Sequence, residues 1–194
     1  MPLDPLILQD EHAALEPLSF DHVEPLERAA ADGALWKLWF TSVPAPGGML
    51  AYVDKALAMQ AQGTSLPFVV RDKRDNAIVG STRFFDFDEN LPRVEIGYTW
   101  YAKSRQRSHV NTACKRLLLA HAFETLKCVA VQFSTDRYNH HSQRAIERLG
   151  ARRDGVLRSH RLRADGSVRD SVVYSIVAAE WADVRRLLTL KLAR

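Results

Sequence analysis

The spacing of hydrophobic residues changes character several times along the chain. Over 49–63 (MLAYVDKALAMQAQG) apolar residues recur every three or four positions and Gly63 ends the run, which predicts a helix. Short apolar runs follow: SLPFVVRD and AIVGSTRFFDF, joined by the turn-prone DKRDN, predict a hairpin. A third strand is predicted over 94–102 (VEIGYTWYA), and Gly97 inside it indicates a bulge or a kink.

The same patterns predict the flanking elements. They are a short strand over 13–20, a helix over 21–33, a helix over about 109–126, a buried strand over 128–136, a helix over 139–150, two strands around the Asp-Gly turn in ADGS, and a closing amphipathic helix, EWADVRRLLTLKL. Three meandering strands therefore lead into a strand–helix–strand unit, which makes two strands parallel. We expect an α/β (α+β) fold, with a mixed central sheet and helices on both of its faces.

Length and composition favour one domain. The chain has 194 residues, 46% of them hydrophobic and 26% charged, which is ordinary for a soluble globular protein. No apolar run approaches the roughly 18 residues of a membrane span, and the acidic N-terminus does not resemble a signal peptide. Cys114 and Cys128 are then best explained as free thiols in a reducing compartment. We therefore expect a cytoplasmic protein without a membrane partner.

Basic residues gather where the third strand leads into the next helix. The formal net charge is +4, and cations cluster over 103–116 and 144–169. Lys103, Arg105 and Arg107 precede a helix N-terminus, where unbonded N–H groups and the helix dipole already favour an anion. The unit therefore predicts a site for a phosphate or pyrophosphate group. The alternative is that these cations form only a solvated loop.

Three stretches of the chain resemble one known family. VEIGYTWYAKSRQRSHVNTACKRLLLAHAF, VAVQFSTDRYNHHSQRAIERLGARRDGVLR and VRDSVVYSIVAAEW look like the GNAT acyltransferases, and within them the RimJ/RimL-like branch. The resemblance covers about residues 13–190. It implies a single GNAT acetyltransferase domain over 1–194, a sheet of about six to seven strands, and acetyl-CoA as the co-substrate.

The family's acetyl-CoA signature, Gln/Arg-x-x-Gly-x-Gly/Ala, falls on residues 106–111 of this chain. Gln106 matches, whereas His109 and Asn111 stand where the family usually has Gly and Gly/Ala. Glycines allow backbone amides to approach phosphate oxygens closely, and Asn tolerates unusual backbone angles better than most residues. His109 is bulkier, and it either stacks on the cofactor or crowds it. The resemblance implies these cofactor-binding residues: Trp100, Tyr101, Arg105, Gln106, Arg107, Ser108, His109, Val110, Asn111, Thr112, Asn139 and Ser142.

The segment STDRYNHHS resembles the part of the family that holds the pantetheine arm. The resemblance implies that Asn139 bonds this arm and that Ser142 lies near the thiol. Asn139 could also simply cap the helix that follows it. Many relatives carry a general-acid Tyr where this chain has Ile146, which leaves Ser142, Tyr174 or solvent for that role.

Glu95 matches the strand position at which several family members carry their general base. Transfer to an amine needs a nitrogen that has lost its proton, so a base tuned near neutral pH would serve. Neighbouring Val94, Ile96 and Trp100 would partly desolvate the carboxylate and raise its pKa. The alternative is a Glu on an exposed strand face, paired with an Arg. No covalent enzyme intermediate is required, so neither cysteine is expected to act as a nucleophile.

The acceptor is predicted less sharply. Trp36 and Trp39 lie where the family forms its acceptor pocket, and we expect them, with Glu95, to contact the substrate; they could equally be core residues. The histidines show no metal-ligand spacing, so no metal site is expected. The basic segment 144–169 lacks the interleaved aromatic residues typical of single-strand nucleic-acid binders, so no nucleic-acid partner is expected.

Two functions remain in competition. The first is an acetyl-CoA-dependent N-acetyltransferase that moves the acetyl group directly, in a ternary complex, to a primary amine on a protein N-terminus or on a small molecule. The second is a non-catalytic acyl-CoA-binding module. A homodimer is a further expectation, since relatives often pair, with the final strand and the C-terminal helix as candidate contacts.

Overall fold

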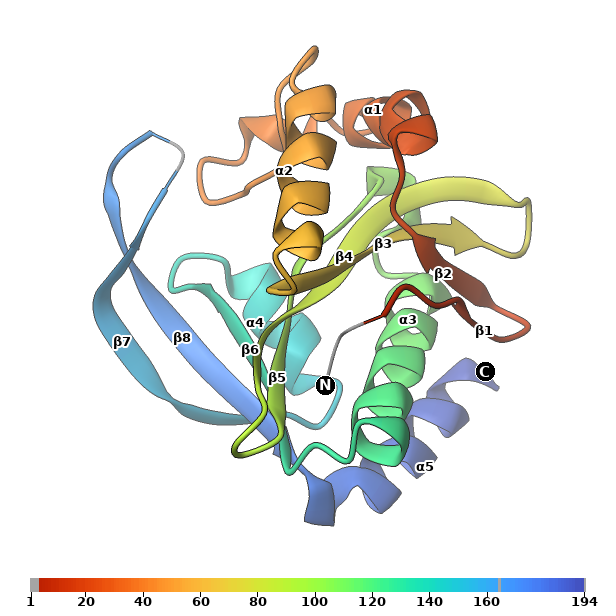
Figure 1. Ribbon diagram of the computed structural model, residues 1–194, viewed down its shortest axis with the longest axis vertical. Coiled ribbons are helices and arrows are strands. Elements are labelled where there is room, and N and C mark those ends of the chain that lie inside the picture. Colours follow the sequence, from red (N-terminus) through yellow and green to blue (C-terminus); the bar gives the residue numbers. More distant parts are fainter. Residues whose placement is uncertain (1–3, 164, 194) are drawn as a thin grey trace.

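The computed structural model describes residues 4–163 and 165–193, which form one eight-stranded sheet with helices packed on it (Figure 1). The strands are β1 (Leu8–Gln9), β2 (Ala13–Pro17), β3 (Ser65–Asp72), β4 (Ala77–Asp88), β5 (Arg93–Tyr101), β6 (Ala130–Asp136), β7 (Arg152–Leu162) and β8 (Val168–Val177). The helices are α1 (Val23–Ala31), α2 (Met49–Ala61), α3 (His109–Ala120), α4 (His140–Glu147) and α5 (Trp181–Leu192). The spatial order of the strands is β1-β2-β3-β4-β5-β6-β8-β7.

The sheet is mixed, as the sequence predicts. Strands β5 and β6 run parallel and are joined by α3, whereas all the other neighbouring pairs are antiparallel. The strand count is one higher than expected, because β1 was not predicted. It has two residues, too few to carry an alternating pattern, and it forms by pairing with β2. The predicted helix over 109–126 also differs in detail: α3 ends at Ala120 and a wider π-helical turn covers His121–Thr125.

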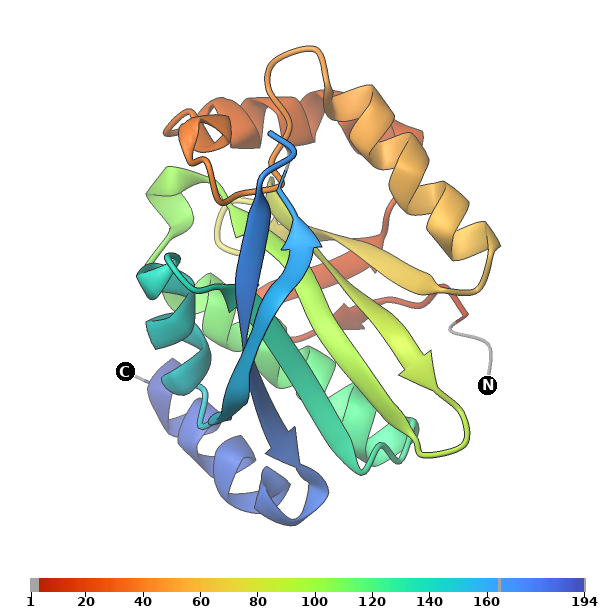
Figure 2. The ribbon, with the colours of Figure 1, turned by 90° about the vertical axis from the view of Figure 1, so that its left-hand side faces the viewer.

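Helices cover both faces of the sheet (Figure 2). On one face α1 and α2 bury an apolar cluster that includes Leu26, Val53, Val69 and Trp100. On the other face α3 and α5, with α4 beside β6, cover a larger cluster that includes Leu118. Successive side chains of a strand point to opposite faces of the sheet, so neighbouring strand residues contribute to different cores.

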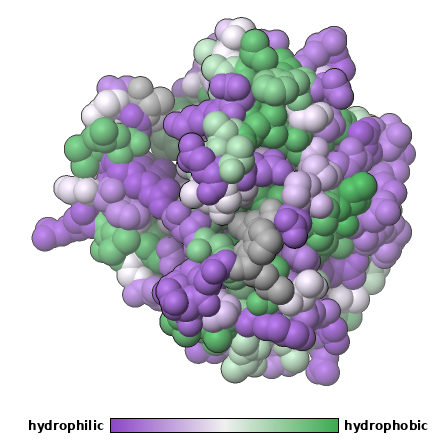
Figure 3. Space-filling model, viewed as in Figure 1, coloured by the Kyte–Doolittle hydropathy of each residue, from purple (hydrophilic) through white to green (hydrophobic). Residues whose placement is uncertain are grey.

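Strand β7 forms the edge of the sheet, and β8 lies inside it between β6 and β7. Strand β8 therefore has no free edge with which to pair a strand of a second copy, because both of its edges already have partners in the same chain. Hydrophilic side chains are prominent over the β7–β8 hairpin on the face seen in Figure 3. Among the described residues, no helix combines the length and apolar content that crossing a bilayer would need.

Candidate active site

The parallel pair β5 and β6 opens after three residue pairs. Its register is Arg93↔Ala130, Val94↔Val131 and Glu95↔Gln132. Beyond Glu95, β5 continues to Tyr101 with β4 on its other side, and β6 continues to Asp136 paired with β8. The edges of β5 and β6 that would face each other past this point are thus left without a strand partner. Such edges present backbone N–H and C=O groups that can bind an extended ligand.

Strand β5 bulges at the start of this open segment. Ser81 pairs with Trp100 and Arg83 with Gly97, so β5 holds one more residue than β4 between these pairs. Tyr98 adopts the left-handed conformation, with φ 51°. Gly97 is required because a Cβ there would lie 2.7 Å from Cε1 of the Phe85 ring. The predicted bulge is confirmed, and its extra residue follows Gly97.

Glu95 is the last β5 residue paired with β6, and its carboxyl group is buried. The side chain is 4% exposed, so the alternative of an exposed glutamate is wrong. The Ser134 hydroxyl donates to Oε1, Gln132 Nε2 lies 3.4 Å from Oε2, and Arg161 Nη2 lies 3.7 Å from Oε2. Burial raises the pKa of Glu95, and the Ser134 hydrogen bond and the Arg161 charge oppose the shift only in part.

The surroundings of Glu95 hold three residues that sequence reasoning missed: Gln132, Ser134 and Arg161. Ser134 follows Gln132 at a spacing of two on β6, so both side chains lie on the face of the sheet that Glu95 occupies. The period-two pattern could have indicated this once the parallel pairing was known. Arg161 comes from the distant strand β7, and no local signal connects it with Glu95.

The loop between β5 and α3 is fixed by its own polar side chains. Gln106 Nε2 donates to the Tyr101 carbonyl at 3.1 Å. The Ser108 hydroxyl donates to the Arg105 carbonyl at 2.6 Å and accepts from the Val110 amide at 3.3 Å, which makes Ser108 the N-cap of α3. Arg107 is exposed, with a left-handed φ of 60°. These bonds hold the first turn of α3 at the open edge of β5.

Asp72, at the end of β3, binds the side chains of two predicted cofactor residues, Arg105 and His109. Its buried carboxylate lies 3.0 Å from Arg105 Nη1 and 3.2 Å from His109 Nε2. Arg105 also pairs with Asp75. The His109 ring is therefore turned towards β3, with its centroid 5.8 Å from that of His12, and it is neither exposed for stacking nor directed into the loop.

Four other predicted cofactor residues have buried side chains: Trp100, Tyr101, Val110 and Thr112. The Trp100 indole donates to the Tyr52 hydroxyl at 3.2 Å, on the α2 side of the sheet. The Thr112 hydroxyl accepts from Arg148 Nη2 at 2.9 Å, which ties α3 to the segment after α4. Any contact from these positions to a ligand must therefore come mainly from the backbone. Asn111 remains half-buried near the start of α3.

Asn139 caps α4, as one of the two sequence interpretations predicts. Its Oδ1 accepts from the Ser142 amide at 3.0 Å, and the Ser142 side chain is partly exposed. Ile146 is buried in the core. The Tyr174 hydroxyl donates to Glu147 at 3.0 Å, and burial together with this carboxylate raises the pKa of Tyr174 to about 12. Of the two side chains proposed as the acid, Ser142 is the exposed one.

Trp36 and Trp39 line a surface cavity of about 340 Å³ in the segment that precedes α2. Trp39 also packs against Tyr138, with ring centroids 5.5 Å apart, and the Arg163 guanidinium lies 4.7 Å from its ring centroid. It thereby joins this segment to the β6–α4 turn and to the β7–β8 hairpin. Trp39 therefore contacts Tyr138, the residue before Asn139, whereas Glu95 does not line this cavity.

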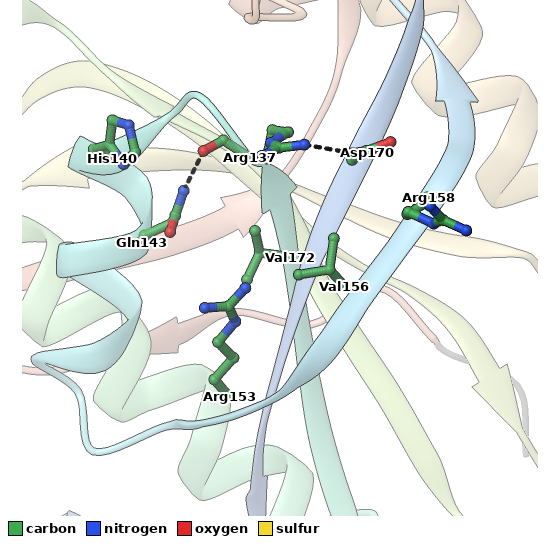
Figure 4. Close-up of a pocket in the computed structure, with 8 residues that line it drawn as sticks. All are labelled: Arg137, His140, Gln143, Arg153, Val156, Arg158, Asp170 and Val172. Atoms are coloured by element: carbon green, nitrogen blue, oxygen red, sulfur yellow. Dashed lines mark hydrogen bonds and ion pairs between the residues drawn. The ribbon is translucent and has the colours of Figure 1, made fainter.

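A second surface cavity, of about 370 Å³, lies between α4 and the β7–β8 hairpin (Figure 4). It is lined by Arg137, His140, Gln143, Arg153, Val156, Arg158, Asp170 and Val172. Arg137 pairs with Asp170 at 2.9 Å across it. None of the predicted site residues lines this cavity. Over residues 4–163 and 165–193, no group of three or more His, Cys, Asp or Glu side chains is placed to hold a metal ion.

Comparison with known proteins identifies the family. Residues 13–152 match the acetyltransferase (GNAT) domain. The crystal structure of an inferred acetyltransferase from T. thermophilus has a TM-score of 0.88 and 32% identity, covering 99% of this chain and 100% of that one.

Two further structures share the fold at lower identity. A GCN5-related N-acetyltransferase from Brucella melitensis has a TM-score of 0.87 and 24% identity, over 99% of this chain and 87% of that one. Mycobacterium smegmatis RimJ, in complex with CoA-disulfide, has a TM-score of 0.77 and 22% identity, over 98% and 95%. The chain therefore belongs to the GNAT acetyltransferase family.

Proposed function

We propose that this protein is an acetyl-CoA-dependent N-acetyltransferase that moves the acetyl group directly to a primary amine in a ternary complex. One observation carries the proposal: a buried glutamate with a raised pKa stands where the parallel pair β5–β6 opens. The opening offers backbone groups to an extended ligand, and the glutamate offers a base beside it. Family membership supplies the acetyl group as the transferred unit.

The residues around the opening fit acetyl-CoA. Because His109 is held against Asp72, its side chain does not occupy the loop where the family usually has glycine. The first turn of α3 can then present its backbone amides to a pyrophosphate, with Arg107 exposed beside it. Asn139 and Ser142 at the start of α4 would hold the pantetheine arm. RimJ of M. smegmatis, which shares the fold, was solved with CoA-disulfide, and this supports the assignment.

Glu95 is proposed to take a proton from the acceptor amine, directly or through water. Bound acetyl-CoA supplies the acetyl group as a reactive thioester. As the new C–N bond forms, the C–S bond breaks, the amine gives up one proton, and the sulfur leaves as a thiolate that takes up a proton. Ser134 and Gln132 orient the Glu95 carboxylate, and the Arg161 charge favours its ionised form. Ser142 is proposed as the donor of a proton or hydrogen bond to the sulfur.

The acceptor is proposed to enter past Trp36 and Trp39, on the α1–α2 side of the sheet. Trp39 with Tyr138 forms an aromatic wall next to Asn139. Either a protein N-terminus or a small amine fits this arrangement. The free, buried thiols Cys114 and Cys128 suit a cytoplasmic protein, and a homodimer is proposed with α5, rather than β8, among its contacts.

The alternative is a non-catalytic module that binds acyl-CoA. It is favoured by one observation, that Ile146 is buried where many relatives carry their general-acid tyrosine. The two functions make different predictions for the release of free CoA. A catalyst releases it only when a suitable amine is present, whereas a binding module does not release it at all.

The test has two steps on the same protein. Thermal unfolding is followed with acetyl-CoA, CoA and ATP; a ligand at 100 times its Kd adds about 2.7 kcal/mol to the free energy of unfolding. We expect a rise with acetyl-CoA and CoA and little with ATP. CoA release is then followed with a panel of small amines and N-terminal peptides. Stabilisation without release from any amine would favour the binding module, and no stabilisation would contradict both functions.

A further inference from the structure

Lys115 of α3 is a buried cation beneath the β5 bulge. The residue is 4% exposed, and its Nζ donates to Thr99 Oγ1 at 2.7 Å and to Thr82 Oγ1 at 3.2 Å. The two hydroxyls are also 2.7 Å apart. Thr99 belongs to the bulge itself, since it follows Tyr98. The ammonium group therefore reaches the bulge from the α3 side of the sheet.

Arg83 of β4 is a second buried cation, and it meets the bulge from the opposite side. The residue is 2% exposed. Its guanidinium carbon lies 4.0 Å from the Tyr98 ring centroid and 5.4 Å from that of Tyr52 on α2. Its Nη1 lies 3.7 Å from the Met59 sulfur, and its Nε has no hydrogen-bond partner in the part of the chain that the structure describes. Consecutive bulge residues, Tyr98 and Thr99, are thus each held by a buried cation.

Neither cation has a carboxylate partner among the described residues. Close to Lys115, burial raises the pKa of the Cys114 thiol to about 12 and that of the Tyr101 hydroxyl well above its usual value, so both groups stay neutral. The carboxylates that act on Cys114 are committed elsewhere: Asp10 to Arg116 at 2.7 Å and Asp72 to Arg105. Along the π-helical turn, burial lowers the pKa of His121, which favours its neutral form.

Two unpaired buried charges are costly, and proteins usually pair or neutralise them. Here both lie at one point of the chain, the bulge where β5 loses its β6 partner. They leave a positive potential at the backbone of residues 98–99, and burial of both cations limits its screening by solvent. A potential of this sign stabilises a negative charge that develops nearby.

We propose that Lys115 and Arg83 are positioning residues that hold the β5 bulge and stabilise the negative charge developing on the attacked carbonyl oxygen. This inference rests on the proposed function. It assigns to the two cations a task that Arg105 of the loop, which is paired with Asp72 and Asp75, does not share. It also explains why Thr99 carries a hydroxyl: the hydroxyl connects the ammonium group to the bulge.

A first test uses the free protein. Burial lowers the pKa of Lys115 to about 8 from 10.5, so the unfolded chain holds this proton up to a higher pH than the folded one. Wild-type stability should therefore rise from about pH 8 to pH 10.5 relative to Lys115→Met, which has no proton to lose. We expect K115M to melt at a higher temperature than wild type near pH 6.5, with a gap that narrows above pH 8. A K115M variant less stable than wild type at every pH would overturn the inference.

A second test measures kcat of wild type and of K115M at each pH and takes their ratio. Ionisation of the acceptor and of Glu95 affects both proteins and therefore cancels in this ratio. We expect a ratio of about tenfold or more near pH 6.5, falling towards one above about pH 9, with the Kd for acetyl-CoA unchanged. Arg83→Met should show a similar ratio that does not change over this range. Lys55→Met, the same substitution at an exposed position of α2, is the matched control and should leave kcat unchanged.

The threonines separate the hydrogen bond from the charge. Thr99→Val removes the link between Lys115 and the bulge, and Thr82→Val removes only its second partner. We expect T99V to lower kcat more than T82V. A pH-independent ratio for K115M, or a change in KM for acetyl-CoA without a change in kcat, would contradict the inference and leave the proposed function standing. If wild type releases no CoA with any amine, the proposed function and the catalytic role of the two cations are both wrong. The melting curves of wild type and K115M still decide whether the Lys115 charge is unpaired.

Discussion

The loop between β5 and α3 and the bulge of β5 are neighbours along the chain, yet their cations have different partners. In the loop, Arg105 binds both Asp72 and Asp75, and His109 shares Asp72. At the bulge, Lys115 has two threonine hydroxyls and Arg83 has aromatic rings, and neither is within ion-pair distance of a carboxylate among the described residues. Arg105 therefore stabilises the loop through its two acid partners, whereas Lys115 and Arg83 keep their charges free of a counter-ion.

This contrast teaches that the number of cations near a site is a poor guide to where an anion is stabilised. A cation that pairs with an acid adds little field beyond the pair, whereas a buried cation without a counter-ion acts over several ångströms. The predictions below either remove the pairing in the loop or change the charge at the opening of the sheet.

The largest effect is expected from Asp72→Asn, which removes the shared anchor of the loop. Asp72 is buried and holds Arg105, His109 and the Arg74 amide. Loss of its charge leaves Arg105 with Asp75 alone and should cost about 3 kcal/mol or more of the free energy of unfolding. Urea denaturation measures this loss, and acetyl-CoA binding should weaken as well. Asp75→Asn removes the exposed acid partner of the same arginine; it is the matched control and should lower stability clearly less than Asp72→Asn. An equal loss of stability in Asp72→Asn and Asp75→Asn would contradict the role of Asp72 as the main anchor of the loop.

Glu95→Gln removes the proposed general base at the opening between β5 and β6 and keeps a side chain of the same size. We expect kcat to fall about 100-fold, since a general base contributes on that scale. Because the pKa of Glu95 is raised, the wild-type rate should decline as the pH falls through that value, and E95Q should lack this decline. The folded state binds this proton more tightly than the unfolded chain, so the free energy of unfolding falls as the pH rises from the ordinary value of 4.5 through the raised pKa. E95Q should therefore be at least as stable as wild type at pH 7, and a variant that unfolds more easily would point to a structural role instead.

The smallest effect is expected at Asn139, where two variants separate capping from ligand binding. Asn139→Asp keeps an oxygen to accept from the Ser142 amide but removes the amide donor, and Asn139→Ala removes both. N139A should lose about 1 kcal/mol of stability, and N139D should lose little. If Asn139 also binds the pantetheine arm, both variants should weaken binding of CoA, measured by calorimetry. Full CoA affinity in N139D would limit Asn139 to its capping role.

Much of the fold could be predicted from hydrophobic spacing, because most elements are long enough to show their period. The hairpin β3–β4, the helix α2 and the parallel crossover through α3 all follow from it. The exceptions have local physical reasons: β1 has two residues and exists only as a partner of β2.

The site was harder to predict, because its important contacts join distant elements. Glu95 was identified by its match to a strand position of the family, and its apolar neighbours in the sequence predicted the raised pKa. Asp72, the partner of Arg105 and His109, lies more than 30 positions earlier in the chain. Lys115 gave a signal that was overlooked: it shares a helix face with Leu118 and Leu119, both fully buried, so helical periodicity alone places it inside.

The most direct test of the unpaired charge at the bulge is the titration of Lys115 itself, followed by NMR of lysines labelled at the side chain, with K115M used to assign its signal. The account predicts a midpoint of about 8, well below the exposed lysines, because two hydroxyls cannot replace the water that burial removes. A midpoint at the ordinary value of 10.5 would mean that an anion or water compensates the charge. The contrast between the loop and the bulge would then be wrong.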